Sequence, residues 1–240
     1  MPRLGSVNLH ASLLPDYRGA SPIQAALLDG RAETGNTTLW IDEGLDTGDM
    51  ILARALAIGP DETAGELSTR LAADGARLLV ETVERIARGD APRKRQDRAR
   101  GSLTRKIRKE AGRLDFTRPA GEVHDRARAM TPWPGAVVAF AGQPVIFERT
   151  RLASFGAVPS AGAGSTGTRA DVSSERARPG AVLGTGAGGG LVVACGVGAI
   201  EVLRIRPAGK GSMEAAAWWR GLRLPPGAED RFTTYEGEAS

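Results

Sequence analysis

The sequence contains few of the residue types that form covalent crosslinks and metal sites. Its 240 residues include one cysteine and two histidines. The single cysteine, Cys195, cannot form an internal disulfide, which is typical of a protein from the reducing cytoplasm. No cluster of cysteine or acidic residues accompanies the histidines, so the sequence predicts no metal site.

Long apolar segments are also absent. No apolar run approaches the roughly 20 residues that span a bilayer, and the first ten residues, MPRLGSVNLH, lack the apolar region of a secretory signal. The hydrophobic share of 41% and the charged share of 25% are ordinary for a soluble chain with a core. A Gly-x-Ser-x-Gly nucleophile elbow is missing, which argues against a serine hydrolase. These absences favour a cytoplasmic protein that does not bind membranes.

Positive charge is concentrated in one segment. The chain has 32 basic and 28 acidic residues, a net charge of +4. Between Arg85 and Arg113 there are twelve basic and three acidic residues, so this segment carries +9 and the rest of the chain −5. Such a segment is typical of a surface that binds a polyanion, and equally of a solvated linker that its arginines keep open.

The first ninety residues predict an α/β unit. Three short segments, apolar or β-branched, predict strands at Leu4–His10, Asn36–Asp42 and Asp49–Ile58. A short helix is expected from Pro22, and a long one from Thr63 to Gly89. The face of the long helix that we expect to be buried carries Leu67, Leu71, Leu78, Val83 and Ile86. Strands that alternate with helices favour a sheet covered by helices.

The remainder predicts a basic linker and an all-β unit. Residues 91–112 are polar and basic, and the short glycine-bounded strands that follow Trp133 are typical of a small barrel or sandwich. A stretch rich in Gly, Ala and Ser at 154–178 predicts a flexible insertion. We expect a last helix at Ala215–Leu222 and a loose tail in the last dozen residues. The predicted parts are therefore 1–90, the linker 91–112, and 113–240.

Several single residues have structural or binding interpretations. Trp218 and Trp219 are expected to pack the last helix on the barrel. Cys195 is expected to be buried and unreactive, and His124 to have a surface or packing role. Lys210 lies in a glycine-flanked turn, where we expect an exposed side chain that meets phosphate.

One group of polar residues predicts chemistry. Asn8 and His10 are two residues apart on an expected strand, so both side chains point from the same face. An amide beside an imidazole can donate hydrogen bonds to an oxygen that becomes negative during acyl transfer. Asp46 lies in the glycine-rich turn Gly44–Asp49, and a carboxylate near an imidazole orients it. The simpler interpretation is that Asp46 only caps its turn.

Several motifs resemble a known enzyme family. The segment VNLHASLLPDYRGASPIQ from Val7, together with GLDTGDM from Gly44, resembles the folate-dependent formyltransferases. TPWPG from Thr131 and RPAGKGSM from Arg206 resemble the members of that family that act on methionyl-tRNA. The resemblance implies an α/β fold with a partial, Rossmann-like sheet of the formyltransferase type, followed by a small all-β, OB-like barrel.

The resemblance also implies a catalytic trio and a co-substrate. Asn8, His10 and Asp46 match the catalytic asparagine, histidine and aspartate of the family, and no metal is implied. The implied co-substrate is 10-formyltetrahydrofolate, whose formyl group passes to the α-amine of methionyl initiator tRNA. The implied folate-binding positions are Ser12, Leu13, Leu14, Pro15, Gly44 and Asp46.

The barrel and the basic segment would then bind tRNA. The implied tRNA-binding residues are Arg18, Arg93, Lys94, Arg95, Arg105, Lys106, Arg108, Lys109 and Lys210. Phosphate contacts of this kind depend on salt and carry little base information. The protein is expected to be a monomer.

This chain resembles a truncated member of the family, because other members have a further segment before the strand expected at Leu4. Without that segment we expect Leu4–His10 to have an unpaired edge. Two alternatives therefore remain open. One is a tRNA-binding remnant without activity. The other is a different formyltetrahydrofolate-dependent transferase or hydrolase, acting on a nucleotide sugar, a purine precursor or water.

Overall fold

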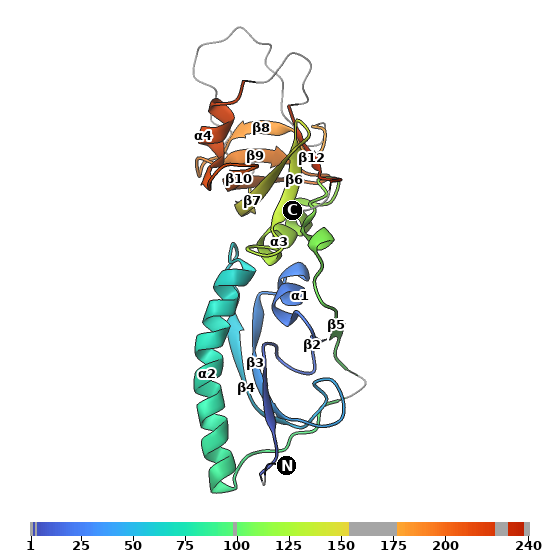
Figure 1. Ribbon diagram of the computed structural model, residues 1–240, viewed down its shortest axis with the longest axis vertical. Helices are drawn as coiled ribbons and strands as arrows, with labels where there is room; N and C mark the ends of the chain where they lie inside the picture. The colour runs from blue at the N-terminus through green and yellow to red at the C-terminus, as the bar shows by residue number, and fades with distance from the viewer. Residues whose placement is uncertain (1, 3, 98–99, 154–176, 224–229, 238–240) are drawn as a thin grey trace. The chain divides into compact units, whose positions relative to one another are not determined.

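The chain folds into two compact units, Met1–Ile107 and Arg108–Ser240. A computed structural model describes residues 2, 4–97, 100–153, 177–223 and 230–237 (Figure 1). The boundary between the units falls inside the predicted linker, 91–112. The predicted limits 1–90, 91–112 and 113–240 stay a prediction. The predicted insertion at 154–178 lies almost entirely outside the described residues.

The first unit contains an antiparallel sheet of three strands within the part of the chain that the structure describes. Its strands are β1 (Val7–His10), β3 (Glu33–Trp40) and β4 (Met50–Ala57), in the order β1-β3-β4. The three predicted strands are therefore confirmed, with ends shifted by a few residues. Among the described residues β1 pairs with β3 alone, so β1 lies at an edge of this sheet.

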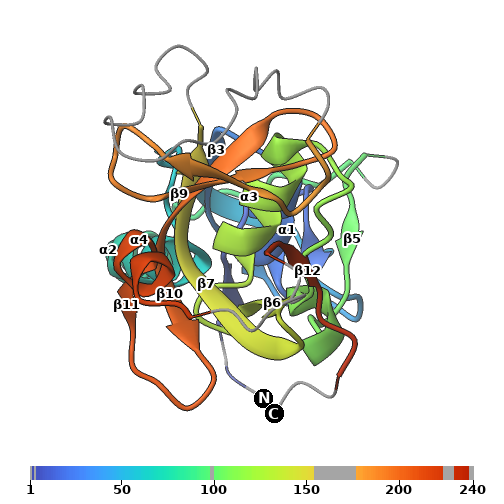
Figure 2. The same cartoon turned by 90° about the horizontal axis from the view of Figure 1, so that it is seen from above.

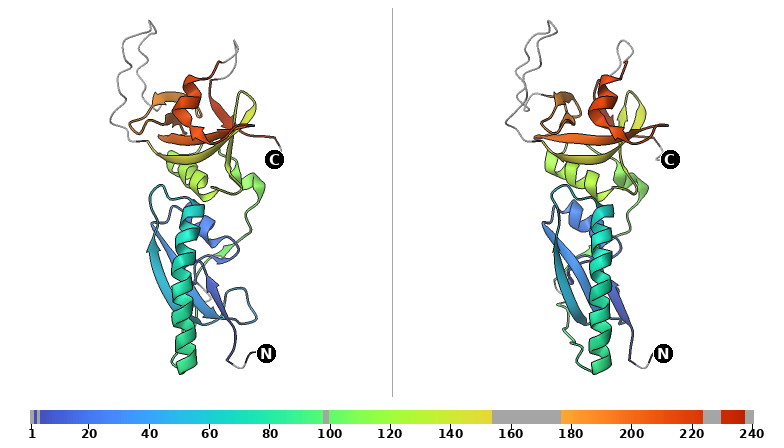
Figure 3. Two further views of the ribbon diagram at one scale, coloured as in Figure 1. Left: turned by 60° about the vertical axis from the view of Figure 1, so that its left-hand side comes forward. Right: turned by 90° about the vertical axis from the view of Figure 1, so that its left-hand side faces the viewer.

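Two helices accompany this sheet in the described part of the first unit: α1 (Pro22–Leu28) and α2 (Ala64–Arg88). Figure 3 shows α2 from two sides as it runs along β3 and β4, which it contacts. Thr63 caps α2 through its hydroxyl, which accepts from the Glu66 N–H at 3.3 Å, while the Glu66 carboxylate accepts from the Thr63 N–H at 2.9 Å. This reciprocal capping box fixes the start of the helix.

The predicted buried face of α2 is correct in its first part and wrong near its end. Leu67, Leu71 and Leu78 are at most 2% exposed, whereas Val83 is 53% exposed. Thr82 follows Leu78 by four residues and takes the buried position, with its hydroxyl donating to the Leu78 carbonyl at 2.7 Å. Val83 is one residue, about 100°, further around the helix. None of the helices in the described ranges is long and apolar enough to cross a membrane.

The chain after α2 runs back along the first unit. Lys94 exchanges two backbone hydrogen bonds with Met50, at 2.9 and 3.0 Å. The Arg93 guanidinium lies 4.2 Å from the centre of the Trp40 ring, a cation–π distance. Further along, β5 (Leu103–Thr104) pairs in parallel with β2 (Arg18–Gly19). This part of the predicted linker is therefore held by the first unit.

The second unit is a small β-barrel with helices, as predicted. Its described strands lie in the order β12-β6-β7-β10-β9-β8, with β11 paired to β10. A bridge between Ala181 and Arg231 joins the two ends of this order, and Figure 2 shows β6, β7 and β10 curving around the core. The bounds are η1 (Lys109–Gly112), α3 (Ala120–Ala129), β6 (Ala136–Phe140), β7 (Gln143–Leu152), β8 (Val182–Thr185), β9 (Leu191–Ala194), β10 (Ala199–Pro207), β11 (Met213–Glu214), α4 (Ala215–Arg220) and β12 (Phe232–Thr234).

Aromatic rings fill the core of the barrel. The Phe232 ring centre lies 5.0 Å from that of Phe147 and 5.1 Å from that of Phe140. Trp218 and Trp219 meet Phe140 edge-on at 5.1 and 5.6 Å, which confirms their predicted packing role. The predicted loose tail is wrong at Phe232, because β12 pairs with β6 and places this ring, 1% exposed, in the core.

Cys195 and His124 are internal groups of the barrel, in agreement with their predicted structural roles. Burial raises the pKa of the Cys195 thiol to about 12, so the thiol stays protonated at neutral pH and is a poor nucleophile. His124 is buried, and its Nδ1 shares a hydrogen bond of 2.8 Å with the Thr150 hydroxyl.

Candidate active site

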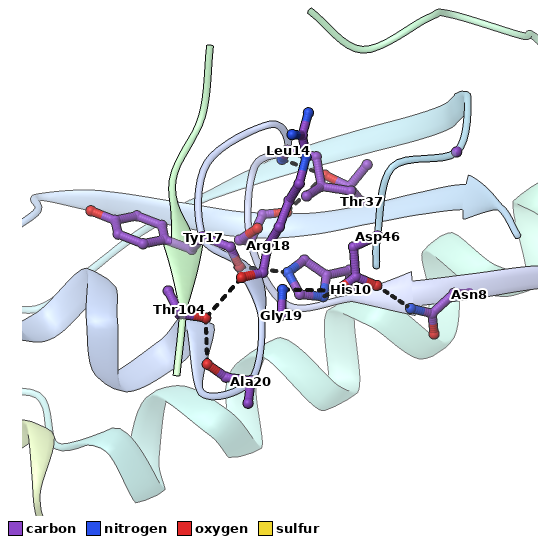
Figure 4. Close-up of polar contacts among 12 residues, drawn as sticks. Asn8, His10, Leu14, Tyr17, Arg18, Gly19, Ala20, Thr37, Asp46 and Thr104 are labelled. Carbon is purple, nitrogen blue, oxygen red and sulfur yellow. Dashed lines mark hydrogen bonds and ion pairs between the residues drawn. The ribbon is translucent and has the colours of Figure 1, made fainter. Parts of the chain in front are cut away.

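Three predicted side chains meet where β1 ends. Asn8 Nδ2 donates to Asp46 Oδ1 at 3.1 Å, and His10 Nδ1 lies 3.5 Å from Asp46 Oδ2 (Figure 4). Asn8 and His10 are two residues apart on β1, so the predicted common face is confirmed. Asp46 comes from the turn between β3 and β4. One carboxylate therefore contacts both the amide and the imidazole.

Both nitrogens of the His10 ring face oxygen atoms. Nε2 lies 2.8 Å from the Tyr17 carbonyl oxygen, and Nδ1 faces the Asp46 carboxylate. Because a carbonyl oxygen only accepts hydrogen bonds, Nε2 carries a proton in this contact. The ring is 6% exposed. His10 is therefore held in one orientation, with its Nε2 proton donated to the Tyr17 carbonyl.

The two partners of His10 have strained backbones. Tyr17 has φ 60° and Asp46 φ 54°, both in the left-handed region. Such a conformation costs a non-glycine residue about 1–3 kcal/mol and is concentrated at functional sites. The fold therefore tolerates two destabilising backbone conformations, which place the Tyr17 carbonyl and the Asp46 carboxylate next to one imidazole.

The side chain of Tyr17 anchors this strained residue. Its hydroxyl donates to Asp29 Oδ2 at 2.8 Å and accepts from Arg31 Nε at 2.9 Å. Burial raises the pKa of the phenol, and the hydrogen bond to Asp29 raises it further, while the hydrogen bond to Arg31 opposes both. The phenol therefore stays neutral and keeps donating to Asp29.

Gly19 supplies a second hydrogen bond to the Asp46 carboxylate. Its backbone N–H donates to Asp46 Oδ2 at 2.9 Å. Gly19 has φ 91°, and a Cβ at this position would lie 2.8 Å from the Thr104 carbonyl oxygen. Only glycine fits both the backbone angle and the close approach of β5. Within the described ranges, no three His, Cys, Asp or Glu side chains are grouped as metal ligands.

The predicted folate-binding loop after β1 is fixed from its inner side. Ser12 and Leu14 are buried. The Thr37 hydroxyl donates to the Ser12 carbonyl at 2.7 Å and accepts from the Leu14 N–H at 3.1 Å. The side chains of Ser12 and Leu14 therefore support the loop. The predicted positions that are partly or fully exposed are Leu13, Pro15, Gly44 and Asp46.

The predicted tRNA-binding residues are divided between the two units. The first unit holds Arg18, Arg93, Lys94, Arg95, Arg105 and Lys106, and the second holds Arg108, Lys109 and Lys210. All of them are exposed except Arg18. Arg18 is half-buried and donates from Nε and Nη2 to Gln96 Oε1, at 3.0 and 2.8 Å. Its guanidinium is therefore bound to an internal partner.

Gln96 is a site residue that the sequence did not reveal. Its Nε2 donates to the carbonyl oxygens of Asp46 and Gly48, both at 2.8 Å, while its Oε1 accepts from Arg18. Gln96 is buried, although its neighbours in the basic segment are exposed. The one signal that could have found it is an uncharged residue inside the run RKRQDRAR. Gln96 links the turn of Asp46 to the loop that follows His10.

Two family models match the chain. The model "Formyl transferase" matches residues 1–83, and "Formyl transferase, C-terminal domain" matches residues 106–223. Relatives called methionyl-tRNA formyltransferase are each 42% identical to the chain in Solibacter usitatus, over 221 residues, and in Parvibaculum lavamentivorans, over 226. These matches cover 92% and 94% of the chain, and 64% and 67% of the two relatives. The chain belongs to the formyltransferase family.

Solved structures show the same formyltransferase fold at low sequence identity. HypX from Aquifex aeolicus is 18% identical with a TM-score of 0.63, and the match covers 91% of this chain and 36% of that one. An N-formyltransferase from Helicobacter canadensis is 19% identical with a TM-score of 0.57, over 82% of this chain and 65% of that one. The family relation thus agrees with an α/β unit followed by a β-barrel.

Replacing Gln96 with leucine tests how much the hydrogen bonds from Gln96 to the turn of Asp46 stabilise the first unit. The change leaves the carbonyls of Asp46 and Gly48 without their donor, and a buried polar group that loses its partner costs about 1–3 kcal/mol. We expect the free energy of unfolding of the first unit to fall by that amount in a urea titration. Arg95→Gln, on an exposed neighbour, should change it by less than about 0.5 kcal/mol. Equal effects in both variants would show that Gln96 is not a special contact.

Proposed function

We propose that this formyltransferase moves the formyl group of 10-formyltetrahydrofolate to the α-amine of methionyl initiator tRNA. The observation that carries the proposal is the single carboxylate of Asp46, which orients Asn8 and His10 at the end of β1. The relatives that are 42% identical are called methionyl-tRNA formyltransferase, which supports this acceptor. A structure of HypX contains tetrahydrofolic acid, which supports the same class of co-substrate.

The three side chains would divide the chemistry among them. 10-Formyltetrahydrofolate supplies an activated formyl group; a C–N bond to the amine forms as the bond to folate nitrogen breaks. We expect Asn8, whose amide has a second N–H, to stabilise the formyl oxygen as it becomes negative. His10 would add a second donor once its Nε2–H leaves the Tyr17 carbonyl, which lies 2.8 Å away in this structure. In this exchange the amine loses a proton and the folate nitrogen gains one, and His10 would assist that transfer. Asp46 holds both groups in place.

The loop and the basic residues would bind the two substrates. The outer side of the loop from Ser12 to Pro15, together with the turn at Gly44 and Asp46, is proposed to contact folate. The inner side is already occupied, because Thr37 binds the Ser12 carbonyl and the Leu14 N–H. The exposed basic residues of both units are proposed to contact tRNA phosphates. Arg18 would act indirectly, through Gln96.

Formation of formyl-methionyl-tRNA tests the proposal directly. The chain is incubated with methionyl initiator tRNA and 10-formyltetrahydrofolate, and formyl-methionine is measured after the tRNA is deacylated. We expect product, and a loss of about 10²–10⁴-fold in His10→Ala, the size of a general acid–base contribution. A reaction without 10-formyltetrahydrofolate is the control.

Two other results would favour the rival functions. Tight tRNA binding without any formyl transfer would identify a non-catalytic tRNA-binding protein. This alternative is tested because the chain spans 64% of the length of its Solibacter usitatus relative. Release of formate, or transfer to a nucleotide sugar, would identify another activity of the family.

A further inference from the structure

A cavity in the second unit takes no part in the site around Asp46. Its volume is about 320 Å³. Its floor crosses three neighbouring strands: Val137 of β6 is opposite Ile146 of β7, and Ile146 is opposite Arg206 of β10. These residues alternate with the core residues Val138, Val145 and Ile205. The floor is therefore on the outer face of the barrel, where Val137 and Ile146 are apolar although alternation favours polar residues.

The walls of this cavity come from segments far apart in the sequence. Pro134 and Gly135 lie before β6, residues 208–210 form the turn after β10, and Tyr235 follows β12. Thr234 is opposite Val138 on β6, so Tyr235 reaches the cavity from the β6 side. Arg206 enters from the β10 side. An aromatic ring and a guanidinium therefore lie at opposite ends of an apolar floor.

The charge at this cavity has one sign. Lys109, Arg206 and Lys210 are among the lining residues, and no acidic residue is among those described there. Arg206 Nε donates to Glu148 Oε1 at 3.0 Å, and Glu148 is not one of the residues that line the cavity. This bond orients the guanidinium. Lys109 and Lys210 are exposed at the rim. An apolar floor with an aromatic ring and cations suits a flat base that carries a phosphate.

We propose that this cavity binds one unstacked nucleotide of the tRNA. The base lies on Val137 and Ile146 beside the Tyr235 ring, and its phosphate meets Lys109 or Lys210. A volume of about 320 Å³ is at the low end for small-ligand pockets, which fits a single base and excludes a duplex. This inference rests on the proposed function for the identity of its partner, tRNA. It does not depend on formyl transfer.

Binding of fluorescently labelled, unacylated initiator tRNA to the full chain tests the pocket. We expect Tyr235→Leu to weaken binding roughly ten-fold through the loss of one base–aromatic stack, with an unchanged salt dependence. Tyr235→Phe should bind as the native chain does, because it keeps the ring. Lys210→Ala should weaken binding and lower the slope of log K against log salt by about one.

Arg204→Ala is the matched control for Lys210→Ala. Arg204 is an exposed cation on β10 that pairs with Glu214, and it does not line the cavity. The proposed binding is contradicted if Tyr235→Leu binds tRNA within two-fold of the native chain, or if Tyr235→Phe loses as much tRNA affinity as Tyr235→Leu. It is also contradicted if Arg204→Ala has the same effect on tRNA affinity and salt dependence as Lys210→Ala. Absence of tRNA binding by the native chain also overturns it. A chain with Tyr235-dependent binding but no formyl transfer supports the pocket while the proposed activity fails.

Discussion

Replacing Asp46 with asparagine is expected to lower kcat for formyl transfer by about 10²–10⁴-fold, the range of a positioned proton-transfer group. The Asp46 carboxylate accepts hydrogen bonds from the Asn8 amide and the Gly19 N–H, and its Oδ2 lies 3.5 Å from His10 Nδ1. Asparagine has one oxygen for these donors, and its own amide would face at least one of them. His10 then loses its orientation. Because Asp46 acts through Asn8 and His10, which are proposed to stabilise the formyl oxygen only as it becomes negative, we expect kcat to fall more than KM changes.

Asp42→Asn is the matched control for this prediction. Asp42 lies in the same turn and accepts from the Gly44 N–H at 3.0 Å and the Thr47 hydroxyl at 2.7 Å through one oxygen. An asparagine oxygen can accept both bonds, so the formyl-transfer activity of Asp42→Asn should stay near that of the native chain. Activity of Asp46→Asn within ten-fold of the control would remove Asp46 from the proposed trio and leave it as a turn residue.

Replacing Phe232 with alanine is expected to lower the free energy of unfolding of the second unit by about 3–5 kcal/mol. The ring is 1% exposed and lies within 5.1 Å of the ring centres of Phe140 and Phe147. Its loss leaves a cavity where β12 closes the barrel. The change is measured by guanidinium unfolding, followed through the fluorescence of Trp218 and Trp219.

Thr233→Ala separates the effect of the Phe232 ring from that of strand pairing. Thr233 is the next residue of β12, is half-buried and points to the other face of the strand. Its replacement should cost at most about 1 kcal/mol, the range of strand propensities. Comparable losses in both variants would mean that the backbone of β12, and not the ring, stabilises the barrel.

The common face of Asn8 and His10 was predictable because it depends only on local strand geometry. A strand places every second side chain on one face, so the spacing of these residues alone brings both to the same side. Asp46 could be placed near them only through the glycine-rich turn and the family resemblance, since 36 residues separate it from His10. The family relation now supports that resemblance, while the catalytic roles of the three residues stay a prediction.

Gln96, Thr82 and Phe232 were missed for a different reason. Each is defined by its contacts with distant segments: Gln96 with the turn of Asp46, Thr82 with Thr38, and Phe232 with Phe147. A polar residue in a basic run, a threonine in a helix and a phenylalanine in a polar tail look like surface residues. Tertiary contacts override such local signals.

The division of the chain at Ile107 and Arg108 affects how its stability can be expressed. The large core cluster, which runs from Leu114 to Phe232, belongs wholly to the second unit. Leu67, Leu71 and Leu78 pack in the first. Two-state thermodynamics describes one cooperative core, and chains with several domains violate it. A single melting temperature would therefore average two quantities, one that governs the geometry around Asp46 and one that governs the barrel.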